Sequence, residues 1–390
     1  MFPSIPKDIS NAKFNGNIII IGAGVSGLMA ANTLKYMGFD NYEVLEGSDR
    51  VGGRLKAAEN FHEEVPLDLG AEWIHFSDER VVKDMLVFKE DIEKGLSASE
   101  FIRYKPQMWF GSKRSRFMEF LYQETKWKRS TWFHWLELHV YGHVKEKVLL
   151  NSTVQLIDYG NEGSPIKLVL ADGSEKFADK VICTIPLAVL KSDTIKFSPE
   201  LPEKKRSAID AMKMPPGFRI LFQMKEKFYP DVTSANSFWN TIVNDGYEVC
   251  AMYDALYKKD LSNSQNVLAY VAIGEVNAGE MSKLSDDELA KAALAKIDEV
   301  FNGQASKNYV KHVVQNWTSD PYIMGSYSTP GVSKSTRSEV GKTIDEKLLF
   351  AGEHTSLKYF SLVHGAAIEG QNAAIEAVMG NAKETISCSL

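Results

Sequence analysis

The stretch IIIIGAGVSGLMAANTLKYMGFDNYEVLE, residues 18–46, decides the fold of this chain. Its four leading isoleucines are typical of a parallel strand buried on both faces. The pattern GxGxxG follows at once, and residues 28–37 predict a helix that ends at a glycine. A second strand, 42–46, closes on the acid Glu46, which would accept hydrogen bonds from ribose hydroxyls. Strand, glycine turn, helix, strand and acid in this order predict a dinucleotide-binding unit of the Rossmann type.

Each position of the glycine turn has a physical role at a cofactor. Gly22 permits the tight turn, Gly24 lets the backbone approach a pyrophosphate, and Gly27 lets helix and strand pack closely. Val25 and Ser26 open the helix, whose free N–H groups and positive dipole end face the phosphates. A lone GxGxxG is weak evidence, and here the flanking strands and the acid carry the assignment.

Two segments beyond this unit extend the predicted site. RVGGR, residues 50–54, suggests backbone close to a ligand at Gly53 and a guanidinium on a phosphate at Arg54. Alone it would indicate an exposed basic turn, but its place directly after the acid favours the phosphate contact. DLGAEWIH, residues 68–75, combines small residues with an aromatic ring and a histidine, His75.

Composition places the chain among globular proteins of two or three domains. It has 390 residues, 44% of them hydrophobic and 25% charged, with a net charge of -6, which argues against broad nucleic-acid binding. Three cysteines form no disulfide framework and favour a reducing compartment. No signal peptide or apolar run of membrane-spanning length occurs, so we expect a cytoplasmic protein without a membrane anchor. The oligomeric state is left open.

The sequence resembles the flavin-containing amine oxidase family, which includes monoamine oxidases, polyamine oxidases and histone lysine demethylases of that fold. The matching stretches lie in family order between residues 18 and 374: IIIIGAGVSGLMAA, VLEGSDRVGGRL, DLGAEWIH, VICTIPLAVLK, WTSDPYIMGSYS and LLFAGEHTS…VHGAAIEGQNAA. The resemblance implies an FAD cofactor. FAD is expected to bind non-covalently, because no cysteine falls where monoamine oxidases attach it.

The resemblance also implies further FAD contacts. Backbone at Val154 would meet the adenine, Gly352 and Glu353 would lie along the ribitol and pyrophosphate, and the last helix would point its N-terminus at the flavin ring. The remaining contacts implied in this way are Gly70, Ala71, Glu72, Trp73, Leu362, Val363 and Ala366.

The chemistry implied by the family is oxidation of a primary or secondary amine. Hydride passes from the carbon beside the nitrogen to flavin N5, the imine hydrolyses, and O2 restores the flavin and yields H2O2. The lysine of the family is replaced here by Arg219, and the aromatic pair that flanks the amine aligns with Thr318 and Leu362. The candidates for the catalytic site are Arg219, Trp317, Tyr359 and His75.

These departures leave alternatives for the reaction. The chain could be a desaturase or oxidase acting on carbon–carbon bonds, or an amino-acid oxidase that uses Arg219 for the substrate carboxylate. A flavoprotein without catalysis is disfavoured by the retained C-terminal segment. A histone demethylase is not expected, because no long helical insertion interrupts the second lobe.

The predicted architecture is α/β with two domains. Residues 1–78, 145–205 and 312–390 would form the Rossmann-type FAD-binding domain, and residues 79–144 and 206–311 a substrate-binding domain of mixed sheet and helices. Tryptophans and basic residues alternate between 109 and 135, which favours a helical lobe with aromatics inward and charges in water over a nucleic-acid surface. His139 and His143 have zinc-like spacing, but no further ligand supports a metal site. A capping box at Ser285 predicts a helix in the second lobe.

Overall fold

The structure is a computed structural model of the chain. It describes residues 2–7, 9, 12, 14–75, 80–88, 90, 100–104, 109–110, 113–114, 124–160, 163–229, 249–259, 261–263 and 265–380. For residues 75, 103–104, 109–110, 113–114 and 124 it describes the backbone alone. The sequence also predicts a strand over residues 237–243 from its apolar pattern, and both this segment and the cysteine at 388 lie outside these ranges.

A five-stranded parallel sheet forms one centre of the molecule. All four isoleucines of its middle strand are buried, as the apolar run predicts. The strands, in spatial order, are β10 (Val148–Leu149), β2 (Tyr42–Leu45), β1 (Ile18–Ile21), β14 (Lys180–Cys183) and β20 (Leu348–Phe350). Strands from three distant parts of the chain therefore meet beside the glycine turn.

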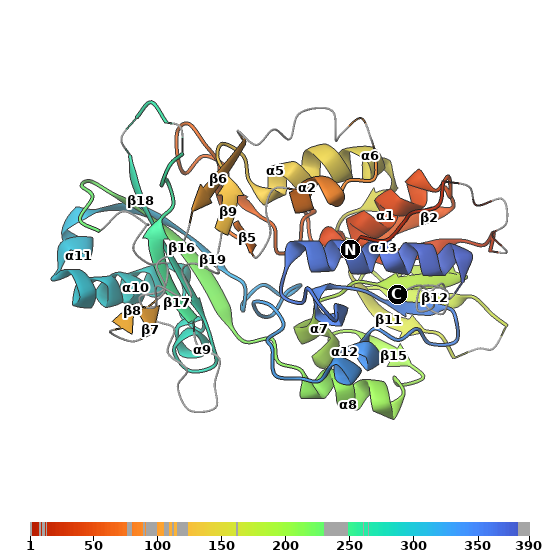
Figure 1. The fold of residues 1–390 in the computed structure, drawn as a ribbon. Coiled ribbons are helices and arrows are strands. Elements are labelled where there is room, and N and C mark those ends of the chain that lie inside the picture. Colours follow the sequence, from red (N-terminus) through yellow and green to blue (C-terminus); the bar gives the residue numbers. More distant parts are fainter. Residues whose placement is uncertain are drawn as a thin grey trace.

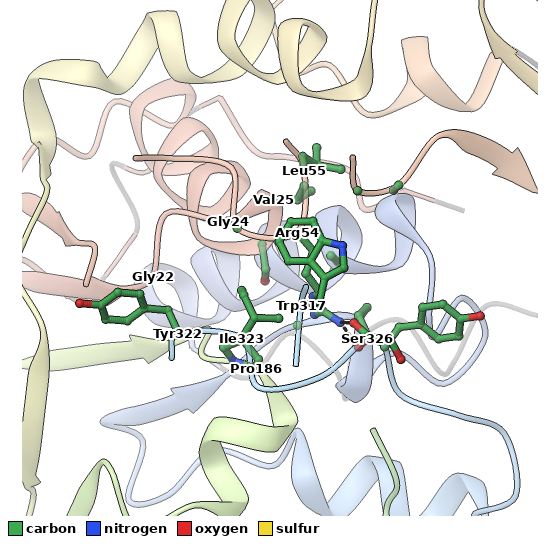
Figure 2. A pocket seen from close by; sticks show the side chains of 18 of the residues that line it. Gly22, Gly24, Val25, Arg54, Leu55, Pro186, Trp317, Tyr322, Ile323 and Ser326 are labelled. Atoms are coloured by element: carbon green, nitrogen blue, oxygen red, sulfur yellow. Dashed lines mark hydrogen bonds and ion pairs between the residues drawn. The ribbon is translucent and has the colours of Figure 1, made fainter. Parts of the chain in front are cut away.

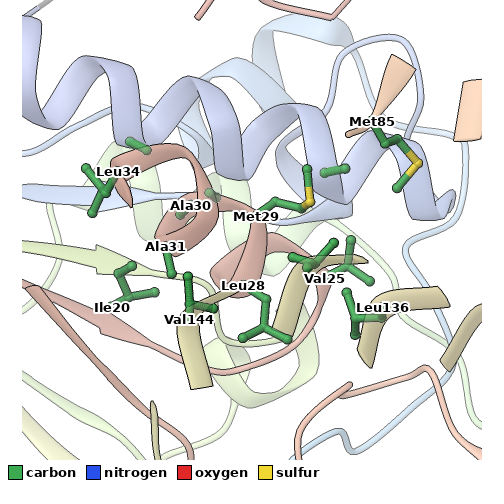
Figure 3. Packing of buried hydrophobic residues seen from close by; sticks show 14 of the residues in the cluster. Ile20, Val25, Leu28, Met29, Ala30, Ala31, Leu34, Met85, Leu136 and Val144 are labelled. Atoms are coloured by element: carbon green, nitrogen blue, oxygen red, sulfur yellow. The ribbon is translucent and has the colours of Figure 1, made fainter. Parts of the chain in front are cut away.

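Helix α1 (Val25–Tyr36) is buried along most of its length, because other helices cover it. It lies beside the last helix, α13 (Val363–Met379), which runs across the sheet as the blue helix of Figure 1. Figure 3 shows the side chains of Leu28 and Leu34 packed among neighbours from the sheet and from later helices. A helix that is apolar on every side requires such enclosure.

The tryptophan-rich segment supplies part of that cover. Helix α5 (Trp132–Leu136), the π-helical turn η2 (Glu137–Tyr141) and α6 (Gly142–Val144) pack against α1. Trp132 and Trp135 are buried in the same cluster as α1, which confirms that these aromatics point inward. Two details of the prediction are wrong. Residues 109–110, 113–114 and 124–127 form strands rather than helix, and Lys126 is buried because it pairs with an internal acid.

That strand belongs to a small antiparallel sheet above the cavity. Its members are β5 (Trp73–His75), β9 (Glu124–Trp127) and β6 (Phe101–Tyr104). A further four-stranded sheet flanks the parallel one and consists of β13 (Glu175–Ala178), β12 (Ile166–Leu170), β11 (Val154–Asp158) and β15 (Lys196–Ser198).

The second lobe is an antiparallel sheet covered on one face by helix α10 (Asp286–Phe301), on the left of Figure 1. The capping box predicted at its start is present, since Glu288 accepts hydrogen bonds from the backbone N–H and hydroxyl of Ser285. Phe218, Ile220 and Phe222 face this helix. The strands, in spatial order, are β17 (Val249–Asp254), β18 (Asn266–Ile273), β16 (Gly217–Met224) and β19 (Tyr309–Asn316).

Shorter elements connect these layers. They are β3 (Ala57–Ala58), β4 (Leu67–Asp68), α2 (Arg80–Asp84), β7 (Trp109–Phe110), β8 (Lys113–Arg114), η3 (Lys145–Lys147), α7 (Leu187–Lys191), α8 (Glu203–Ala211), α9 (Asn277–Met281), α11 (Gln304–Asn308), α12 (Lys334–Val340) and η5 (Glu353–Thr355). None of the helices in the described ranges has the length and hydrophobicity needed to cross a bilayer.

Candidate functional site

One cavity of about 1370 Å³ joins the two lobes. It begins at the carboxyl ends of β1 and β2, where parallel sheets usually bind ligands, and ends against the antiparallel sheet. Figure 2 shows Gly22, Gly24 and Val25 in its lining together with Arg54 and Trp317. Every predicted site residue whose side chain the structure describes lines this cavity, except Gly27. The contacts of all these residues with a cofactor or substrate stay predictions.

The glycine turn has the conformation that its sequence predicts. Gly22 has a φ of +101°, which side chains rarely adopt, and it directs the chain from β1 into α1. A Cβ on Gly27 would lie 1.9 Å from the carbonyl oxygen of Gly22, so helix and turn could not approach as they do. The predicted turn and close packing are confirmed.

The start of α1 has the donors that a dinucleotide phosphate requires. The hydroxyl of Ser26 is buried and finds no hydrogen-bond partner among the described residues, although it lies in the cavity lining. The helix N-terminus adds unsatisfied N–H groups and a positive dipole end. An orphaned buried hydroxyl at a helix N-terminus fits a bound phosphate.

Glu46 is the acidic residue of this dinucleotide subsite. One carboxylate oxygen accepts from the backbone N–H of Ala23 at 2.6 Å, and the other accepts from the N–H and hydroxyl of Ser48, each at 2.9 Å. These bonds fix the carboxylate at the end of β2 and leave lone pairs for ribose hydroxyls. The residues present therefore fit the dinucleotide that the sequence predicts.

The two arginines of the RVGGR segment have different tasks. Arg50 donates to the carbonyls of Val51, Gly53 and Leu55 at 2.6–3.1 Å and so holds its own loop. Arg54 donates at 2.9 Å to Glu353, which starts the turn after β20. This ion pair ties the N-terminal and C-terminal parts of the site together.

Glu353 is ionised in a buried place because of its neighbours. Burial raises its pKa, but Arg54, His354 and the Ser328 hydroxyl outweigh that effect and bring the pKa to about 2. The backbone N–H of Ser361 also donates to it at 2.7 Å. The carboxylate therefore acts as a fixed acceptor at the centre of the C-terminal segment.

His354 follows directly and is also buried. Burial lowers its pKa to about 4, even though the Glu353 carboxylate favours the protonated ring. The imidazole is therefore neutral at physiological pH. Beyond it, Leu362, Val363 and Ala366 bring the N-terminus of α13 to the cavity, as the resemblance implies.

Arg219 and Glu72 form a charged centre in the cavity lining, beside the antiparallel sheet of the second lobe. They are buried and joined at 2.7 Å, and Glu72 also pairs with Lys126 at 3.2 Å and accepts from the Tyr253 hydroxyl. Burial works against the charged form of Glu72, but Lys126 and Arg219 keep its pKa below its ordinary value. Burial and the nearby Lys126 lower the pKa of Lys259 to about 8. Cations thus surround the buried carboxylate of Glu72.

The wall opposite the dinucleotide subsite comes from one face of the antiparallel sheet. Alternation puts every second residue of β17 and β18 on this face, namely Val249, Ala251, Tyr253, Val271 and Ile273. Tyr253 was not predicted from the sequence. Its alternation with apolar residues in 249–254 was a usable signal, but only pairing with β18 shows which face meets the cavity.

The aromatic candidates differ in how far the structure supports them. Trp317 and Tyr359 line the cavity. Tyr327 and Phe360 line it as well, although neither is among the predicted site residues. Thr318 does not line it, because its hydroxyl bonds to the backbone of Gly217.

The histidine candidates are settled only in part. His75 ends β5, and its catalytic role stays a prediction. His139 and His143, weighed above as a zinc pair, contact the rings of Trp135 and Phe88.

Comparison with known proteins places the chain in a family. Residues 25–131 and 137–378 match the family model described as flavin containing amine oxidoreductase. The chain belongs to this family. FAD is accordingly its cofactor, and it is an oxidoreductase, as the sequence predicts.

Individual relatives are distant. Polyamine oxidase 3 of Oryza sativa subsp. japonica is 25% identical over 96% of this chain and 92% of its own length. The human lysine-specific histone demethylase 2 is 26% identical over 95% of this chain but 54% of its own length. Among solved structures, cyclohexylamine oxidase from Brevibacterium oxydans IH-35A is 15% identical with a TM-score of 0.70, over 93% of this chain and 99% of that one. This last likeness confirms the predicted fold.

Proposed function

We propose that this member of the family oxidises an amine held between the flavin and the antiparallel sheet. Molecular oxygen would be the final electron acceptor, and the products would be an imine, which hydrolyses, and hydrogen peroxide. The observation that carries the proposal is the continuity of the cavity. Its volume of about 1370 Å³ exceeds that of an ordinary ligand pocket, about 300–1,000 Å³, and leaves room for a substrate beside a dinucleotide.

The cofactor would be held by the residues of the dinucleotide edge and the C-terminal segment. Ser26 and the start of α1 would bind phosphate, Glu46 the ribose, and Val363 and Ala366 the ring end. Neither Cys183 nor Cys250, the cysteines in the described part of the chain, lines the cavity, which supports non-covalent binding. When bound, the flavin supplies a two-electron acceptor for the carbon beside the amine nitrogen.

The chain itself would orient the amine and keep it neutral. An amine with a pKa of about 10.4 is protonated in water, and its nitrogen lone pair is then blocked. The apolar wall around Val249 and Ile273 excludes water, and burial away from water disfavours the protonated form of an amine. This desolvation lowers the amine pKa. The rings of Trp317 and Tyr359 would then bound the space in which the neutral amine sits.

Recognition of an amino-acid carboxylate by Arg219 has weaker support. Both terminal nitrogens of its guanidinium already donate within the protein, one of them to Glu72, and Nε alone is without a partner among the described residues. A bidentate clamp on a substrate carboxylate needs two free donors on the same edge of the guanidinium. The structure therefore favours amines over amino acids as substrates.

An anaerobic titration of the purified yellow protein tests the proposal. Monoamines, polyamines and amino acids are added in turn while the visible flavin band is recorded, and air is then admitted. We expect bleaching by one class of amine, then recovery of the band with release of hydrogen peroxide. A chemical reductant serves as the positive control for a reducible flavin.

Two results would contradict the proposal. Bleaching by amino acids alone would assign Arg219 to a carboxylate. A flavin that the chemical reductant bleaches and no amine does would favour oxidation of carbon–carbon bonds.

A further inference from the structure

Three consecutive backbone carbonyls in the segment 68–72 are held by side chains from distant parts of the chain. Arg219 Nη1 donates to the carbonyl oxygens of Asp68 and Gly70 at 2.9 and 2.8 Å. Trp317 Nε1 donates to the carbonyl between them, that of Leu69, at 3.2 Å. Arg219 lies in β16 and Trp317 follows β19, so every one of these bonds comes from the second lobe or its edge.

Few other hydrogen bonds hold the segment 68–72 on the side of the second lobe. β4 ends at Asp68 and β5 begins at Trp73, so the residues between them have no place in a sheet ladder. The N–H groups of Leu69 and Ala71 donate to carbonyls of Lys56 and Arg54, on the side of the first lobe. The two lobes thus form hydrogen bonds with opposite edges of one short loop. A buried carbonyl without a partner is costly, so these bonds determine where the loop lies.

Glu72 explains why an arginine can do this inside the protein. Its carboxylate accepts from Arg219 Nη2 at 2.7 Å and neutralises the buried guanidinium. The planar head presents Nη1 to two carbonyls and Nη2 to the carboxylate, whereas the three donors of a lysine sit on one nitrogen at the end of a differently shaped side chain. The guanidinium is 5% exposed, so solvent does not replace any of these partners.

The loop held in this way faces the cofactor part of the cavity. Gly70, Ala71 and Glu72 all line it, and a Cβ on Gly70 would lie 1.8 Å from the carbonyl oxygen of Arg54. Its backbone therefore sits as close to the RVGGR segment as packing allows. A small shift of the loop would change the shape of the flavin subsite directly.

We propose that Arg219 and Trp317 are positioning residues that fix the loop 68–72 for flavin binding, and that Arg219 does not bind substrate. The inference deepens the proposed function and rests on it only for the place of the flavin in the cavity. It assigns to the arginine at the family's lysine position a task that uses two separate donor nitrogens.

Titration of the flavin-free protein with FAD tests this proposal. The quenching of flavin fluorescence gives a dissociation constant for wild type, Arg219→Lys, Trp317→Phe and the control Arg206→Lys. Arg206 also donates to two carbonyls, but it lies in α8 with 40% of its side chain exposed and does not line the cavity. The visible flavin band and the melting temperature of each flavin-free variant are recorded alongside.

We expect Arg219→Lys to weaken FAD binding about tenfold or more, because hydrogen bonds to charged groups are worth about 1.5–3 kcal/mol. Trp317→Phe removes one hydrogen bond between neutral groups and should weaken FAD binding by a factor of about 2–10. The visible flavin band should shift in the same direction in Trp317→Phe as in Arg219→Lys. Arg206→Lys should leave the FAD affinity and the flavin band unchanged. At saturating FAD, the KM for an amine should stay within about twofold of wild type in Arg219→Lys.

The proposal is overturned if Arg219→Lys and Trp317→Phe bind FAD as wild type does with an unchanged band. It is also overturned if Arg219→Lys raises KM selectively for amines that carry a carboxylate while FAD binding is unaffected. If Arg219→Lys does not fold, Trp317→Phe decides, since it leaves every buried charge paired. The measurement of FAD affinity needs no substrate, so it stands even if no amine is oxidised.

Discussion

At the scale of single residues, His354 predicts how stability depends on pH. Its pKa is about 4 in the folded chain, against about 6.5 in the unfolded one, so between these values the unfolded state binds more protons. Stability therefore falls as the pH drops from 6.5 to 4 and is level above 6.5. We expect His354→Gln to remove up to about 3 kcal/mol of this loss. Urea unfolding of the flavin-free protein between pH 2 and 7.5 measures it.

Glu353→Gln provides the comparison, because its window is different. The pKa of Glu353 is about 2, below its ordinary value of 4.5, so its contribution is present above pH 4.5 and lost as the pH falls toward 2. Each variant should reduce the pH dependence of the free energy of unfolding in its own range, which is pH 6.5 to 4 for His354→Gln and pH 4.5 to 2 for Glu353→Gln. If His354→Gln unfolds with the same dependence between pH 4 and 6.5 as wild type, the buried neutral imidazole is not the cause.

At the scale of elements, the contact of α1 with α13 depends on Gly370. A Cβ there would lie 2.1 Å from the carbonyl oxygen of Ser26. Helix propensity alone predicts that Gly370→Ala stabilises by about 1 kcal/mol, but overpacking costs about 1–3 kcal/mol and should prevail. We expect lower stability and weaker FAD binding, because Ser26 lines the cavity. Met379→Ala at the exposed end of α13 is the control, and equal effects of the two substitutions would contradict the packing argument.

The elements also show how much could be predicted from the sequence. Residues 18–46 carry a local signal at every position, and strand, turn, helix and acid are all confirmed. The capping box at Ser285 is another local signal. Arg219 differs, since its partners Asp68, Gly70 and Glu72 lie 147–151 residues away and nothing near it in the sequence indicates them. Alignment alone made it a catalytic candidate, and only the fold shows how its donors are used.

Burial of Lys126 could not be predicted for the same reason. Its neighbours alternate tryptophan with charge, a pattern typical of an exposed polar face. The acid that neutralises it, Glu72, stands 54 residues earlier in the chain. A buried charge is decided by its partner, and its own segment carries no sign of it.

At the scale of the whole molecule, the cavity makes the two lobes one binding unit. The dinucleotide edge belongs to the parallel sheet, while the wall belongs to the antiparallel sheet, and the loop 68–72 is gripped by both. A ligand that spans the cavity should therefore stabilise both lobes together. By linkage, FAD at a hundred times its Kd adds about 2.7 kcal/mol to the free energy of unfolding.

This coupling predicts different hydrogen-exchange patterns for FAD and for ADP. ADP carries the phosphate and ribose groups that Ser26 and Glu46 would bind, so it should slow exchange in 22–28 and leave 68–72 and 217–219 close to the flavin-free protein. FAD should protect all three segments, because its ring end reaches the loop that Arg219 holds. Hydrogen exchange is measured on the flavin-free protein, on the protein saturated with ADP and on the protein saturated with FAD, and the protection of the three segments is compared. Protection by FAD confined to 22–28 would mean that cofactor binding does not extend to the second lobe.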